Sequence, residues 1–177
     1  MATPIHRLPL RAPGRLLHAV VDTPKGSRNK YAFDPDLGQW VLRKVLPRGA
    51  AFPYDFGFFP GTQGEDGDPV DVLIVMDEPA FPGCVVTVRL LGVIEARQTE
   101  GRKTTRNDRF IAAAVTKVNR SPLRSLAQLG RQQLDELEQF FVHYNALEGR
   151  RFEPLRRTGP AQASKRLRAA RLDEQDE

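Results

Sequence analysis

The most informative stretch of this sequence is Glu65-Asp66-Gly67-Asp68-Pro69-Val70-Asp71-Val72. It places three aspartates close together, immediately before a run of apolar residues. Gly67 permits a sharp bend and Pro69 stiffens the chain after it, so the three carboxylates can converge on one point. Hard divalent cations such as Mg²⁺ prefer oxygen ligands near octahedral geometry, usually a few carboxylates with water molecules and substrate phosphates. The stretch therefore favours a divalent-metal site at the start of a strand.

Two other interpretations are open when this stretch is taken alone. An ordinary turn rich in aspartate and glycine has the same composition. A calcium-binding EF-hand loop would need a later glycine and a bidentate glutamate at fixed spacing, and the stretch lacks both. The sequence on either side has to separate the metal site from the turn.

The surrounding chain alternates between strand-like runs and turn signals. Apolar and β-branched runs predict strands at residues 16–21, 31–33, 40–45, 70–76, 84–96 and 110–115. The second and third of these runs are predicted to pair as a hairpin around residues 34–38. Residues 1–15 have no hydrophobic period and are predicted to form an extended N-terminal arm. Residues 47–69 contain too many glycines and prolines for a regular element.

Helices are predicted only in the last third of the chain. The helical spacing of Leu134, Leu137, Phe141 and Tyr144 predicts one amphipathic helix. Residues 126–129 are expected to form a preceding turn, and residues 161–172 a second helix within a C-terminal helix and tail at 160–177. Short strands followed by helices are typical of an α+β domain built on a small barrel, here a single domain over residues 1–177.

Composition and charge exclude several classes of protein. The net charge is +5, with arginines gathered in residues 97–109 and 150–171, which suits a solvated face or an anionic ligand. No apolar run is long enough to span a bilayer, and no signal-peptide core is visible. The single cysteine, Cys84, is expected to be a buried structural thiol, and together with the two preceding observations it predicts a cytoplasmic protein. Ser27 and Ser164 have no neighbouring base, and the histidines lack metal-ligand spacing.

Further stretches on both sides of the three aspartates extend the pattern. In chain order they are Val20-Val21-Asp22-Thr23-Pro24-Lys25-Gly26-Ser27, Lys30-Tyr31, Phe52-Pro53-Tyr54-Asp55-Phe56-Gly57-Phe58, Glu78-Pro79, Phe81-Pro82-Gly83-Cys84, Gly92-Val93-Ile94 and Phe140-Phe141-Val142-His143-Tyr144. With the aspartate stretch, they make residues 20–149 resemble the family I soluble inorganic pyrophosphatases. The resemblance implies a small five-stranded OB-like β-barrel flanked by C-terminal helices.

The resemblance also implies an activity, which is Mg²⁺-dependent hydrolysis of inorganic pyrophosphate to two phosphates by a metal-activated water. It implies several Mg²⁺ ions per site, with Mn²⁺ as an alternative, and assembly into a homo-oligomer. The implied metal-binding residues are Asp66, Asp71, Asp68, Asp22, Asn107 and Asp108. The implied catalytic residues are Asp68, Lys30, Arg109, Tyr144 and Lys44. Asp68 is either a ligand or the base that orients the water, and the cations and Tyr144 hold phosphate.

Several positions depart from the pattern of that family. Asp22 stands where the family has glutamate, Ala32 replaces a frequently polar residue, and Phe56 replaces a tyrosine. Asn107 falls on the place of one metal-binding aspartate, while a second such aspartate has no clear counterpart. Glu100 or Asp108 is a candidate to supply a ligand after a shift of the loop, and Asn145 stands where lysine is frequent. A less negative metal site is expected to hold fewer or weaker Mg²⁺ ions.

The departures keep two alternative functions open. One is a related hydrolase with another phosphoanhydride substrate, and the other is a catalytically impaired homologue that binds pyrophosphate or phosphate. An OB-like nucleic-acid binder that uses the basic stretches is disfavoured, because the acidic cluster would repel a phosphate backbone.

Overall fold

The computed structural model describes residues 5–117 and 121–172. Its main feature is a ring of five strands, which are β2 (Leu16–Thr23), β5 (Asp55–Phe58), β6 (Asp71–Val75), β9 (Arg109–Ala114) and β7 (Val85–Glu100). They pair in that order, and β7 also pairs with β2, which closes the ring. The β6–β9 pair is parallel and the other pairs are antiparallel. Closure leaves no free sheet edge among these strands. The predicted α+β fold built on five closed strands is confirmed.

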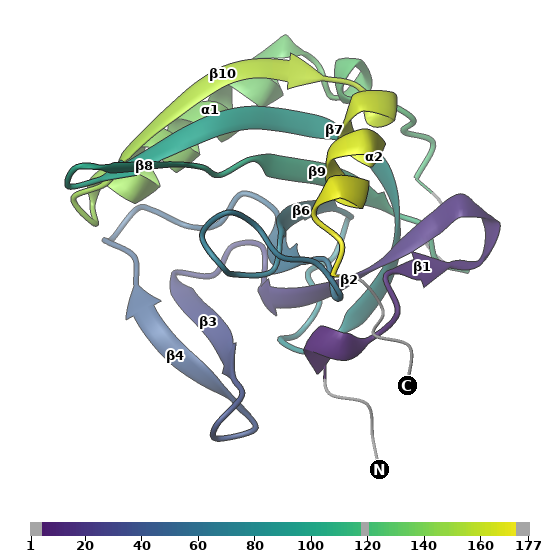
Figure 1. Ribbon diagram of the computed structural model, residues 1–177, viewed down its shortest axis with the longest axis horizontal. Helices are drawn as coiled ribbons and strands as arrows, with labels where there is room; N and C mark the ends of the chain where they lie inside the picture. The colour runs from purple at the N-terminus through teal and green to yellow at the C-terminus, as the bar shows by residue number, and fades with distance from the viewer. Residues whose placement is uncertain (1–4, 118–120, 173–177) are drawn as a thin grey trace.

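Further strands extend the ring at its margins (Figure 1). β1 (Arg11–Ala12) pairs with β2, and both β8 (Lys103–Arg106) and β10 (Arg151–Thr158) pair with β7. β3 (Asn29–Asp34) and β4 (Gln39–Val45) form a separate two-stranded sheet, the hairpin that the sequence predicts. In Figure 1 this hairpin projects away from the rest of the molecule at the lower left.

The helices lie late in the described chain, as expected. α1 (Arg131–Ala146) follows a 3₁₀ turn at Leu126–Leu129 and packs against β10, whereas α2 (Pro160–Ala169) packs against β7. Two further 3₁₀ turns, Ile5–Arg7 and Pro13–Arg15, precede the ring. Within the described residues, no helix has the length and apolar character needed to cross a membrane.

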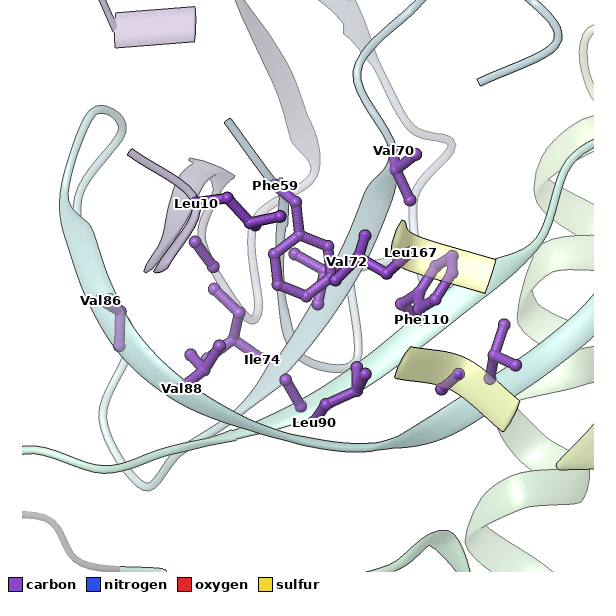
Figure 2. Close-up of a cluster of buried hydrophobic side chains, with 14 of the residues drawn as sticks. Leu10, Phe59, Val70, Val72, Ile74, Val86, Val88, Leu90, Phe110 and Leu167 are labelled. Carbon is purple, nitrogen blue, oxygen red and sulfur yellow. The ribbon is translucent and has the colours of Figure 1, made fainter. Parts of the chain in front are cut away.

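Two apolar clusters lie on opposite faces of the strands. Val72 of β6 contributes to the first cluster and Leu73 to the second, because successive side chains of a strand point to opposite faces. Figure 2 shows the first cluster, where Phe59 and Phe110 meet within the curve of β7 and Leu167 of α2 lies beside them. The second cluster includes the apolar side of α1. Burial on both faces explains why these strands read as continuous apolar runs.

Glycine is required at two positions of the ring. A Cβ atom on Gly57 would lie 1.9 Å from the Val20 carbonyl oxygen, so β5 can approach β2 closely only without a side chain. A Cβ atom on Gly92, whose φ is +158°, would lie 2.3 Å from the Thr158 carbonyl oxygen, at an irregularity in the β7–β9 pairing.

The structure departs from the sequence-based expectations in four segments. Residues 47–69 do contain a strand, β5, because pairing with β2 and β6 on both sides outweighs the local preference of its glycine-containing sequence. β8 and the arginine-rich β10 were not expected either, since both lie at the margin of the sheet with mostly polar residues. Residues 5–15 form short turns and a strand, so this part of the N-terminal arm is not simply extended. Cys84 is only partly buried.

Candidate active site

The principal cavity, of about 710 Å³, lies between the β3–β4 hairpin, the loop before β6, the β7–β9 margin and the end of α1. Four acidic residues predicted as metal ligands line it together with the predicted phosphate-binding residues. The predicted residues that line it are Asp22, Lys30, Asp66, Asp68, Asp71, Asn107, Arg109 and Tyr144. Lys44 and Asp108 are not among its lining residues. The cavity therefore brings together most of the constellation that the sequence singles out.

The loop before β6 presents the three aspartates by a network of short-range hydrogen bonds. The amide of Gly64 donates to the Asp68 carbonyl over 2.8 Å, and the amide of Asp68 donates to Oδ1 of Asp66 over 3.2 Å. Gly67, with φ of +90°, makes the bend. Asp66 and Asp68 are exposed on this loop, while Asp71 opens β6.

Burial and mutual repulsion both act on the aspartates. Burial raises the pKa of Asp68, and the nearby Asp66 carboxylate raises it further. Burial also raises the pKa of Asp71, although the positive charges of Arg109 and Lys30 oppose this increase. Carboxylates in this position are favourable receptors for cations, which relieve the repulsion.

Arg109 meets Asp71 because of strand register. In the parallel β6–β9 pair, Val72 is opposite Phe110, so the preceding residues Asp71 and Arg109 lie side by side at the same end of the two strands. Nη1 of Arg109 donates to Oδ2 of Asp71 over 2.6 Å and also to Oδ1 of Asn107. The guanidinium is only 4% exposed and its carbon lies 4.9 Å from the centroid of the Phe141 ring.

The cavity is also lined by a second buried ion pair, between Asp22 and Lys30. Asp22 lies at an irregularity in the β2–β5 pairing, and its Oδ1 accepts a hydrogen bond from Nζ of Lys30 over 2.9 Å. Burial is the main cause that raises the pKa of Asp22 to about 6, although Lys30 lowers it. Nζ of Lys30 also lies 4.2 Å from the centroid of the Phe56 ring. Phe56 therefore offers Lys30 a π face where the family pattern has a tyrosine.

Lys44 and Tyr144 form a unit at the end of α1. Nζ of Lys44 lies 3.9 Å from the centroid of the Tyr144 ring and is bound to Oε1 of Glu148. Burial lowers the pKa of Lys44, and its ion pair with Glu148 opposes this. Burial raises the pKa of Tyr144, and the negative charge of Glu148 raises it further. The Tyr144 hydroxyl therefore stays protonated and can donate a hydrogen bond.

Asp108 and Glu100, the suggested substitutes for a missing metal ligand, lie elsewhere. Oδ1 of Asp108 accepts hydrogen bonds from the amide of Ala96 and from Nε of Arg106, and the residue lines a neighbouring cavity of about 360 Å³. Glu100, at the end of β7, pairs with Arg150 over 3.4 Å. Their role as metal ligands stays a prediction that this placement does not favour.

Gln98 and Arg150 are among the cavity residues that the sequence did not single out. Gln98 on β7 accepts a 2.9 Å hydrogen bond from Nδ2 of Asn107, so two neutral amides face each other at the cavity wall. Arg150, in the turn after α1, also lines the cavity. Nothing in the local sequence marked Gln98, since a lone amide is uninformative. Arg150 belonged to an arginine-rich stretch whose members could not be told apart.

The donor set suits Mg²⁺ better than a metal held entirely by protein. Within the described residues, no group of three or more histidine, cysteine or carboxylate side chains is arranged as a ready metal cage. Mg²⁺ is usually held by one or two carboxylates and completes its coordination with water and substrate phosphates. Asp66, Asp68 and Asp71 supply oxygen ligands in a cavity that Lys30 and Arg109 also line. These residues fit that requirement.

Comparison with known proteins decides the family. A family model described as inorganic pyrophosphatase matches residues 19–173. The chain belongs to the inorganic pyrophosphatase family. The family resemblance detected in the sequence is thereby confirmed.

Individual members of the family are similar over most of their length. The chain is 35% identical over 144 residues to an inorganic pyrophosphatase of Synechocystis sp., covering 81% of this chain and 83% of the relative. The structure matches that of the Thermus thermophilus inorganic pyrophosphatase with a TM-score of 0.86 at 30% identity, covering 95% and 97% of the two chains. It matches an inorganic pyrophosphatase of Helicobacter pylori with a TM-score of 0.81 at 28% identity, over 92% and 95%. The family fold is thus preserved across the departures at the cavity.

Proposed function

We propose that this protein is an enzyme that hydrolyses inorganic pyrophosphate to two phosphates with Mg²⁺ as its cofactor. One observation carries the proposal, which is that Asp66, Asp68 and Asp71 line one cavity with Lys30 and Arg109. Carboxylates and cations that line the same cavity suit a substrate whose phosphates bind both metal ions and basic side chains. Family membership points to the same reaction.

The side chains have distinct roles in this reaction. When bound, Mg²⁺ neutralises phosphate oxygens and lowers the pKa of water, and Asp66 and Asp71 are its proposed ligands, together with Asp68 and Asp22. Asp68 orients the attacking water, because its exposed side chain lines the cavity beside Asp66 and Asp71.

The cations act on the phosphates. Lys30 and Arg109 stabilise the charge on the phosphoryl oxygens, and the protonated Tyr144 donates to the leaving phosphate. The oxygen of water bonds to one phosphorus as the bridging P–O bond breaks. Lys44 does not line the cavity, because it is held by Glu148 and Tyr144. It contributes only its positive charge, from behind these two residues.

A specific observation favours a second candidate, a pyrophosphate-binding homologue of low turnover. Arg109 neutralises Asp71, and the amides of Gln98 and Asn107 add no negative charge to the wall beside it. Both features weaken metal binding relative to an all-carboxylate wall.

Mn²⁺ as the alternative metal, homo-oligomeric assembly and a cytoplasmic location complete the proposal.

The test is a phosphate-release assay on the purified protein with pyrophosphate, in Mg²⁺, Mn²⁺ and EDTA. Asp68→Asn should abolish Mg²⁺-dependent release, whereas Asp77→Asn, a change of the same kind at an exposed position outside the cavity, should not affect it. Release in EDTA equal to that in Mg²⁺ would refute the metal-dependent mechanism. No release under any metal, combined with measurable pyrophosphate binding, would support the second candidate.

A further inference from the structure

Arg150 lies where the chain leaves α1 and turns into β10. Gly149, with φ of +70°, makes the turn, and the amide of Arg150 donates to the carbonyl of Asn145 over 3.0 Å. The side chain is 36% exposed and lines the same cavity as Lys30, Arg109 and Tyr144. The backbone therefore holds a guanidinium at the α1 side of the candidate active site.

The guanidinium is only loosely held by protein. Its Nη1 lies 3.4 Å from Oε2 of Glu148, and its Nε lies 3.4 Å from Oε2 of Glu100. Charge-assisted hydrogen bonds are usually shorter, about 2.7–2.9 Å. Nε is moreover buried without a hydrogen-bond partner among the described residues. A guanidinium has five donors, so Arg150 retains unused capacity for an anion.

Two described residues near Arg150, Asn145 and Lys44, are engaged with other partners. Asn145, which is 1% exposed, turns its side chain inward and donates to the Phe141 carbonyl over 2.8 Å. Lys44, nearby, is occupied by Glu148 and does not line the cavity.

We propose that Arg150 is a substrate-binding residue that holds a phosphate group at the α1 side of the cavity, which Arg109 also lines. This inference rests on the proposed function, and it identifies the phosphate group as the chemistry that Arg150 recognises. Its planar donors match phosphate oxygens in pairs. Arg150 would leave its long contacts with Glu100 and Glu148 when the anion enters.

The experiment compares Arg150→Gln and Arg150→Lys with Arg151→Gln. Arg151 is the adjacent residue, is 75% exposed, does not line the cavity and pairs with Glu153 on the same strand. Isothermal titration calorimetry measures inorganic phosphate binding at saturating Mg²⁺ and, separately, Mg²⁺ binding alone. Steady-state kinetics with pyrophosphate and circular dichroism accompany each variant.

Arg150→Gln should weaken phosphate binding about 10- to 100-fold, the effect of losing one charge-assisted interaction. The KM for pyrophosphate should rise, Arg150→Lys should recover part of the loss, and Arg151→Gln should match the unsubstituted protein. Mg²⁺ binding alone should be unchanged or tighter, because a neighbouring cation is removed. A residue that merely holds Glu148 would instead weaken Mg²⁺ and phosphate binding together.

Unchanged phosphate affinity in Arg150→Gln, or an equal loss of Mg²⁺ affinity, would overturn the proposal. If the unsubstituted protein releases no phosphate from pyrophosphate yet binds phosphate through Arg150, the proposed reaction fails while this inference holds. If the protein is active and Arg150→Gln binds phosphate normally, only this inference fails.

Discussion

Arg109 and Asp71 occupy equivalent places at the ends of two neighbouring parallel strands, and their side chains are joined by a 2.6 Å hydrogen bond. This pair sets the charge of the metal-side wall, because a guanidinium neutralises one of the three clustered carboxylates. A cation that binds Asp71 has to share it with Arg109. Metal affinity and phosphate affinity in this cavity are therefore coupled through one ion pair.

Arg109→Gln should separate these two effects. Removing the competing cation should tighten Mg²⁺ binding in the absence of phosphate, while turnover should fall about 10- to 100-fold through the loss of a charge-assisted contact to phosphate. Calorimetric titration of Mg²⁺ and a phosphate-release assay provide the two readouts. Weaker Mg²⁺ binding together with unchanged turnover would contradict this assignment.

Mg²⁺ should stabilise the folded protein. A cation bound only by the native state adds about 2.7 kcal/mol at a concentration 100-fold above its Kd. Differential scanning calorimetry should therefore give a higher Tm in excess Mg²⁺ than in EDTA, and Asp71→Asn should reduce the gain. Asp77→Asn, exposed and outside the cavity, is the matched control and should keep it. Identical Tm values in Mg²⁺ and EDTA would show that the aspartate cluster does not bind the metal.

Asn107→Asp combined with Phe56→Tyr should raise activity or lower the Mg²⁺ concentration needed. The aspartate adds negative charge beside Arg109, and Gln98 can rotate its amide to donate to it. The tyrosine adds a hydroxyl at the ring that now contacts Lys30. One restored hydrogen bond to a charged group is worth about 1.5–3 kcal/mol, or about one to two decades in rate.

Initial rates over a Mg²⁺ series test this double variant. Flat activity and flat metal affinity, with Asp68→Asn still inactive, would mean that the site works with a different set of ligands. The single variants show which position carries the gain.

Glu95 should make stability depend on acid pH. It is 3% exposed; burial raises its pKa, but hydrogen bonds from Arg156, Arg106 and Arg166 outweigh this and lower the pKa to about 2. A carboxylate whose pKa is lowered by folding stabilises the native state fully at pH values above its pKa in the unfolded chain, 4.5. This stabilisation is lost as the pH falls through the folded-state pKa of about 2. The shift corresponds to about 3 kcal/mol.

Urea unfolding at several pH values measures this contribution. Glu95→Gln should destabilise the protein at pH 7 and flatten the loss of stability between about pH 4.5 and 2. Glu153→Gln, at an exposed position of β10, should leave the curve unchanged. An unaltered pH dependence in Glu95→Gln would rule out this carboxylate as its source.

The sequence by itself determined the family, four of the five ring strands and the loop that carries Asp66, Asp68 and Asp71. These features are local, because apolar runs specify buried strands and a glycine-proline turn specifies the bend. Strand β5 escaped prediction because its pairing partners lie far away in the sequence.

Only the tertiary structure decided how the remaining groups are used. Asp108 is adjacent in sequence to Asn107 but turns to the Ala96 amide and Arg106, while Gln98 comes to the cavity wall through the pairing of β7 with β8. Arg150 reaches the cavity because a glycine turn reverses the chain after α1. Such assignments depend on strand register and on competition among nearby hydrogen-bond partners, and neither is encoded in a short stretch of sequence.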